Sequence, residues 1–172
     1  MRNSWTINDN SCKRKNENMN DGRFKYQKQI DELLAGGCQL PALYAPNSLQ
    51  ACRFAFSGEG HSNHIPQYLS NPKRMLQDMG KGKANISLLS LSCFTSEEKA
   101  ETFYANLRKT FKNVQYSIGD SLSEGCLTND DGRMTSAAAN GHFDFYEYTT
   151  CDLNITFQIT KSLVEEKKYE EY

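Results

Sequence analysis

The sequence has no excess of charge of either sign. Its 172 residues include 20 Lys and Arg against 21 Asp and Glu, for a formal net charge of −1. A chain with this balance has no overall positive field that would attract the phosphates of a nucleic acid or an anionic membrane surface. We therefore expect neither a nucleic acid nor a membrane as a partner.

Long apolar runs are also missing. No stretch of the sequence is apolar over the length that a bilayer requires. The segment 1–20 contains no apolar core of the kind that a secretory leader carries. Both features favour a cytoplasmic location.

The cysteines lack the spacing of a metal site or a redox motif. None of the six forms a C-x-x-C pair, and their spacing matches no zinc signature. In a cytoplasmic setting we expect reduced thiols, most of them buried as small apolar side chains. The positions are Cys12, Cys38, Cys52, Cys93, Cys126 and Cys151.

The common catalytic motifs are absent as well. There is no G-x-S-x-G of a serine hydrolase, and no glycine-rich segment has the lysine spacing of a phosphate-binding loop. The acidic turn at 129–132 lacks the closing Glu of a calcium loop. Function must therefore be inferred from less specific arrangements of residues.

The length and patterning of the chain indicate one α+β domain. Nine Phe and nine Tyr supply large units for a core. We predict a single domain over 21–162, with helices packed on a mainly antiparallel C-terminal β-sheet. The Asn-rich segment 1–20 is expected to form a flexible arm, and the charged segment 163–172 a C-terminal tail.

Helical signals mark three segments, which are 21–35, a short stretch from Pro72, and 96–112. In the short stretch, Met75, Leu76 and Met79 are expected to point inward. The last segment has the strongest signal, because Thr95 and Glu98 match a capping box ahead of an apolar stripe at helical spacing.

Apolar runs predict the strands. We expect strands at 51–57, 86–94 and 114–118, a hairpin over 126–135 across an Asn-Asp-Asp-Gly turn, and a second hairpin over 141–160.

The hairpin predicted at 141–160 carries a polar misfit. In its first strand Phe143 and Phe145 mark one face, and Glu147 falls on the same face. A carboxylate on an apolar face must be paired, protonated or open to a cleft. The opposite face carries His142, Asp144, Tyr146 and Tyr148.

The chain has three histidines, His61, His64 and His142. His61 and His64 lie close together in a Gly-containing loop, and His142 or a carboxylate would complete a metal site. The alternative is that these rings close hydrogen bonds in an ordered loop, and we favour this interpretation over a metal.

Three residue types in order along the chain support a more specific hypothesis. Arg53 lies on an early strand, Ser90 and Ser92 on a later one, and Glu147 on a late one. Over 53–147 this order resembles the Arg…Ser…Glu layout of ADP-ribosyltransferases. The resemblance implies that NAD is a substrate.

The resemblance also implies roles for individual residues. Arg53 would contact the NAD phosphates or ribose, the strand with Ser90 and Ser92 would support the nicotinamide pocket, and Glu147 would stabilise the positive charge that develops on the ribose. Tyr104, Tyr146 or Phe94 would supply aromatic surface for the nicotinamide. The residue two before Glu147 is Phe145, where many transferring members have Glu or Gln, and this departure from transfer leaves NAD hydrolysis or an inert relic as options.

A non-catalytic protein-binding module, such as an inhibitor, an adaptor or an immunity-type protein, is the alternative. A solvent-facing row of Tyr146 and Tyr148 would suit an interface with a protein partner. The environment of Glu147 separates the two hypotheses. A cleft shared with Arg53 favours an enzyme, whereas a closed ion pair favours a binding role.

Overall fold

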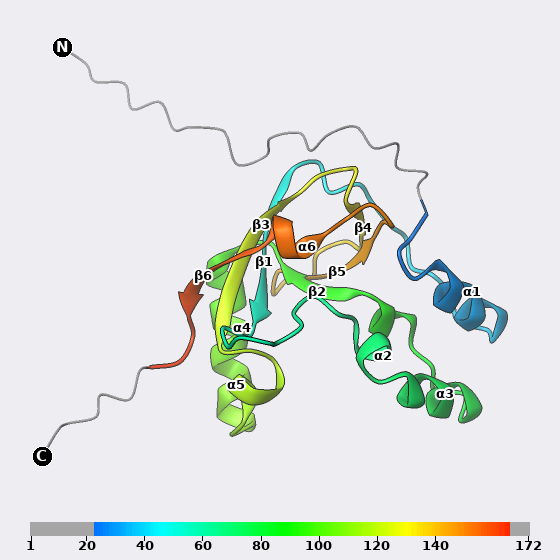
Figure 1. The fold of residues 1–172 in the computed structure, drawn as a ribbon, viewed down its shortest axis with the longest axis horizontal. Helices are drawn as coiled ribbons and strands as arrows, with labels where there is room; N and C mark the ends of the chain where they lie inside the picture. Colours follow the sequence, from blue (N-terminus) through cyan, green and yellow to red (C-terminus); the bar gives the residue numbers. More distant parts are fainter. Residues whose placement is uncertain (1–22, 166–172) are drawn as a thin grey trace, which may run out of the picture.

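A computed structural model describes residues 23–165 of the chain (Figure 1). Within this range, short helices alternate with six strands that form one sheet. The elements are α1 Gln27–Ala35, β1 Leu49–Ala55, α2 Gln67–Ser70, α3 Pro72–Gly80, the 3-10 turn η1 Ile86–Leu89, β2 Leu91–Phe94, α4 Glu97–Thr110, α5 Val114–Ser117, β3 Ser121–Leu127, β4 Gly132–Met134, β5 His142–Glu147, α6 Leu153–Thr156 and β6 Gln158–Ser162.

The six strands are ordered β4-β5-β2-β1-β3-β6, and every neighbouring pair is antiparallel. The predicted α+β class and single domain are confirmed. The sheet is not confined to the C-terminal part of the chain, because β1 and β2 come from its first two thirds and occupy the centre. This order makes β5, β2 and β1 direct neighbours.

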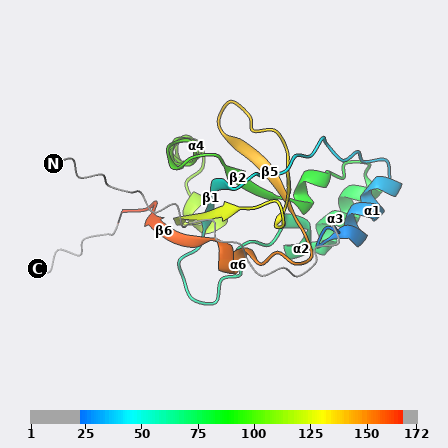
Figure 2. The same ribbon diagram turned by 90° about the horizontal axis from the view of Figure 1, so that it is seen from above.

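Three apolar clusters hold the elements together. On one face of the sheet, α6 covers a cluster that includes Leu91, Phe143 and Phe145. On the other face, α4 packs against Phe94 and Leu122. Figure 2 shows α4 and α6 on opposite sides of the sheet. The third cluster joins α1, α2, α3 and η1 beside the sheet, and its buried members are Ile30, Leu33, Tyr68, Met75, Ile86, Leu89 and Tyr146.

The predicted hairpin at 141–160 is wrong, although its first strand is confirmed as β5. The second half forms α6 and then β6, which pairs with β3 at the far edge of the sheet. Asp152 starts the helix, because its carboxylate accepts a hydrogen bond from the main-chain N–H of Asn154. Ile155 is consequently 68% exposed instead of lying on a buried strand face.

Three other strand predictions are wrong in whole or in part, and the first of them fails because strand pairing is decided at long range. β3 and β4 do not form a hairpin with each other, because β3 pairs with β1 and β4 pairs with β5. The segment 114–118 is helical (α5), and 86–94 begins as η1 before it becomes β2.

The three predicted helices are present as α1, α3 and α4, but their end residues differ from the predicted ones. α4 is capped by Ser96, whose side chain accepts from the N–H of Lys99, and not by Thr95. α1 begins at Gln27, because Phe24 instead forms a β-bridge with Tyr148. The start of the predicted segment, residues 21 and 22, lies outside the described residues, as does the segment 1–20.

Three further expectations concerned individual side chains. In α3, Met75 is buried as predicted, but Leu76 is 67% exposed. The expected solvent-facing Tyr row is wrong, because Tyr146 and Tyr148 are both buried. Cys38, Cys52, Cys93 and Cys151 are reduced, whereas Cys126 is disulfide-bonded, contrary to the expectation of reduced thiols. No helix within residues 23–165 is long and apolar enough to cross a membrane.

Candidate functional site

A groove of about 710 Å³ opens where β1 and β2 meet the loop that precedes α2. Residues from β1, β2 and β5 line its polar side, and rings from β1, β2 and α4 line its apolar side. The residues that concern us are Arg53, His64, Ser90, Ser92, His142 and Asp144, together with Phe54, Phe94 and Phe103. These residues lie close together because β5, β2 and β1 are neighbours in the sheet.

Arg53 crosses the boundary between β1 and β2. The two strands share a single register position, Cys52 opposite Phe94. Close to that position the Nη1 atom of Arg53 donates to the main-chain oxygen of Ser92 at 2.9 Å. The side chain thereby supplies a hydrogen-bond donor to the main-chain carbonyl of Ser92, and its positive charge lies at the groove.

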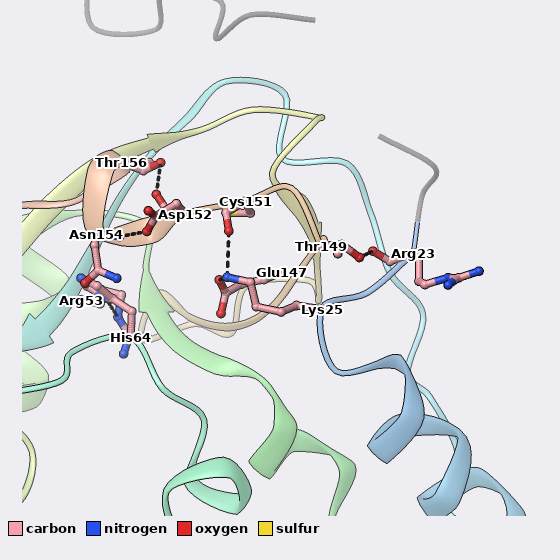
Figure 3. Close-up of polar contacts among 10 residues, drawn as sticks. All are labelled: Arg23, Lys25, Arg53, His64, Glu147, Thr149, Cys151, Asp152, Asn154 and Thr156. Carbon is pink, nitrogen blue, oxygen red and sulfur yellow. Dashed lines mark hydrogen bonds and ion pairs between the residues drawn. The ribbon is translucent and has the colours of Figure 1, made fainter. Parts of the chain in front are cut away.

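His64 holds a second nitrogen of the same guanidinium. The Nε atom of Arg53 donates to Nδ1 of His64 at 2.9 Å (Figure 3). Burial, together with the nearby guanidinium charge, lowers the pKa of His64 to about 4. The ring is therefore neutral at pH 7 and can accept this hydrogen bond. It also packs against Phe157, with ring centroids 5.6 Å apart.

A polar cluster forms across β2 and β5. Ser92 is directly opposite Asp144 in the strand register. The Nε2 atom of His142 lies 3.1 Å from Oγ of Ser92 and 3.8 Å from a carboxylate oxygen of Asp144. Burial raises the pKa of Asp144, while His142 and Ser90 act in the opposite direction. A carboxylate, an imidazole and a hydroxyl thus face one groove.

The aromatic side of the groove is continuous. Phe54 lies against Phe94 and Phe103 with ring centroids 5.3 and 6.3 Å apart, and Phe94 and Phe103 are 5.0 Å apart. The ring of His142 meets the edge of Phe94 at 5.5 Å. A flat heteroaromatic ligand would find apolar surface here next to the polar cluster.

Glu147 is placed differently from the other residues of the predicted site. It does not line the groove, and its side chain is only 2% exposed. Its Oε2 atom pairs with Nζ of Lys25 at 2.8 Å, and Lys25 also donates to the main-chain oxygen of Cys151 (Figure 3). Burial raises the pKa of Glu147 despite the ion pair. The Glu147 carboxylate therefore lies on the apolar face of β5 in a closed ion pair with Lys25.

The remaining predicted residues are divided between the groove and the core. Ser90 lines the groove, is 7% exposed and donates its hydroxyl hydrogen to the Ser87 carbonyl at 2.6 Å. Tyr104 is on the buried face of α4 and donates to the carbonyl of Gly119. Tyr146 lies in the helical cluster, where burial raises its pKa to about 12. Neither tyrosine lines the groove.

The histidines do not form a metal centre. His64 and His142 line the groove, whereas His61 stacks on Phe56 with ring centroids 4.8 Å apart. Among residues 23–165, no three His, Cys, Asp or Glu side chains gather closely enough to hold a metal ion.

Sequence reasoning assigned no role to Asp144, which is the carboxylate of the groove. Its position on the polar face of the predicted strand, two residues after His142, was the available signal. Strand alternation identified the face of β5 on which Asp144 lies, but not the residues on the neighbouring strand that it meets. No family model, no curated protein and no solved structure matches this chain.

Proposed function

We propose that this chain is an NAD-using enzyme, ADP-ribosyltransferase-like or NAD-cleaving, that works in the groove between β1, β2 and β5. One observation carries the proposal. Arg53 and Asp144 line the same groove beside a wall of Phe rings. A cation, an anion and an aromatic surface are the groups that a pyrophosphate, an oxocarbenium-like ribose and a nicotinamide ring each require.

In this proposal Asp144 takes the role that the sequence suggested for Glu147. Glu147 is engaged by Lys25, whereas Asp144 lies in the groove beside His142 and Ser92. The ribosyl C1′–N bond breaks, nicotinamide leaves with the bonding electron pair, and the anionic carboxylate stabilises the cationic ribose. Water or an acceptor then bonds to C1′ and loses its proton. Arg53 binds the diphosphate, and Ser92 and His142 line the reacting end.

The test is thermal unfolding with and without millimolar NAD, with nicotinamide release measured in the same samples. A ligand that binds only the folded chain raises the midpoint. We expect a higher midpoint and nicotinamide release, with release lost in Asp144→Asn and retained in Glu147→Gln. Asp31→Asn, at an exposed position of α1, is the control for the same chemical change outside the groove. Loss of release in a folded Glu147→Gln variant would return the catalytic role to Glu147.

A protein-binding role is the second candidate, and two observations favour it. Glu147 is in a closed ion pair, and large apolar side chains are exposed around α5. Phe111 is 60% and Tyr116 is 78% exposed, and Phe111 and Ile118 line a hollow of about 390 Å³ that adjoins the groove, since Ile118 lines both. If NAD gives neither a shift nor release, pull-downs with the wild type and with Phe111→Ser/Tyr116→Ser would test a protein partner at this surface.

A further inference from the structure

His64 has an unusual backbone for a residue with a side chain. Its φ is +63°, in the left-handed region that glycine favours. Within residues 23–165 the other non-glycine residues with positive φ are Asn47 and Ser48. Of the three, His64 is the one that lines the groove. Backbone strain at a groove suggests that the side chain must be presented in one direction.

The strained backbone presents the ring to Arg53. Nδ1 of His64 accepts from Nε at 2.9 Å, while Nη1 donates to the Ser92 carbonyl at the same distance. Two hydrogen bonds to different nitrogens fix both the position and the plane of a guanidinium. Arg53 also interacts with the buried Cys93 thiol, and the guanidinium N–H groups that these partners leave would donate to a ligand in the groove.

We infer that His64 is a positioning residue, which holds the Arg53 guanidinium in the orientation that binds the diphosphate of the nucleotide. The inference rests on the proposed function for its ligand. His64 does not touch the reacting atoms in this assignment. Its loss should therefore weaken nucleotide binding and leave the rate at saturating NAD nearly unchanged.

Two substitutions separate the hydrogen bond from the backbone strain. Glycine and asparagine both tolerate a positive φ, so His64→Gly and His64→Asn each fit the loop. Only asparagine supplies an acceptor, because its Oδ1 atom stands at the same position along the side chain as Nδ1 of histidine. The pair is therefore matched in conformation and differs in the contact to Arg53.

The first experiment is NAD titration of the wild type and both variants, with KM and kcat from nicotinamide release. We expect His64→Gly to weaken NAD binding about tenfold, the loss typical of a hydrogen bond to a charged group, and to raise KM with kcat within about twofold. His64→Asn should restore most of the affinity. Equal affinity in His64→Gly and the wild type would overturn the inference, and so would failure of His64→Asn to rescue binding.

A second measurement needs no nucleotide. The ¹⁵N-detected Nε–H signal of Arg53 should be protected from exchange at pH 7 in the wild type and in His64→Asn, and lost in His64→Gly. If the wild type binds no NAD, the proposed function fails, and this signal still decides the role of His64. A signal unchanged in His64→Gly, or absent from the wild type, would overturn the inference.

Discussion

Lys25 and Glu147, 122 residues apart in the sequence, form an ion pair of 2.8 Å between the segment before α1 and the end of β5. The pair explains how a carboxylate can lie on the apolar face of a strand. It also removes from the groove the residue that the sequence pattern placed at the centre of catalysis. The carboxylate that remains in the groove is Asp144.

The Lys25–Glu147 pair should contribute to stability in a way that double substitution reveals. Lys25→Met leaves a buried carboxylate without its partner, and we expect the free energy of unfolding to fall by about 2–3 kcal/mol, less than for a fully buried pair because Lys25 is 30% exposed. Lys25→Met/Glu147→Met should recover most of the loss. Urea denaturation of the wild type, Lys25→Met and the double variant measures this, and equal stability of Lys25→Met and the wild type would show that the pair contributes nothing.

Asp144→Asn should increase stability at pH 7 while it abolishes nicotinamide release. Burial raises the pKa of Asp144 above 3.8, so the folded chain binds its proton more tightly than the unfolded chain. The ionised form therefore costs stability at pH values above the folded pKa, and the neutral amide removes that cost. The gain over the wild type should shrink as the pH falls through the folded pKa toward 3.8. A variant that is both less stable and inactive would indicate a structural role.

Stability should also depend on pH through His64. Burial and Arg53 lower the pKa of His64 from 6.5 to about 4, while Asp152 acts in the opposite direction. The unfolded chain takes up a proton at about pH 6.5 and the folded chain only near pH 4, so His64 reduces the stability progressively as the pH falls through this window. Above pH 6.5 the effect is absent. In His64→Asn the fall in melting temperature over this window should be smaller, and identical profiles would contradict the assignment.

The start of α4 offers a test of which residue caps the helix. Ser96→Ala removes the acceptor for the N–H of Lys99, and we expect a loss of about 1 kcal/mol in the free energy of unfolding. Thr95→Ala is the matched control, because the neighbouring hydroxyl does not cap the helix. A larger loss in Thr95→Ala, measured by chemical denaturation, would restore the capping box that the sequence predicted.

Local patterns were enough to predict several parts of the molecule. The apolar stripe over 96–112 predicted α4, because side chains three and four apart share a helix face wherever the helix lies. Alternation in β5 likewise placed Phe143, Phe145 and Glu147 on one buried face, and it required the carboxylate to be paired, protonated or open to a cleft. Asn71-Pro72 marked the start of α3, since a cap and its helix are adjacent in sequence.

Strand pairing was decided only by the tertiary structure. β6 follows β5 in sequence but lies at the opposite edge of the sheet, and β2 lies between β5 and β1. The site depends on this order. Asp144 on β5 is opposite Ser92 on the neighbouring strand β2, and Arg53 reaches the main-chain oxygen of Ser92 from β1. Alternation along a strand determines which face a side chain takes, whereas its neighbours across the sheet depend on contacts between distant segments, which no local pattern contains.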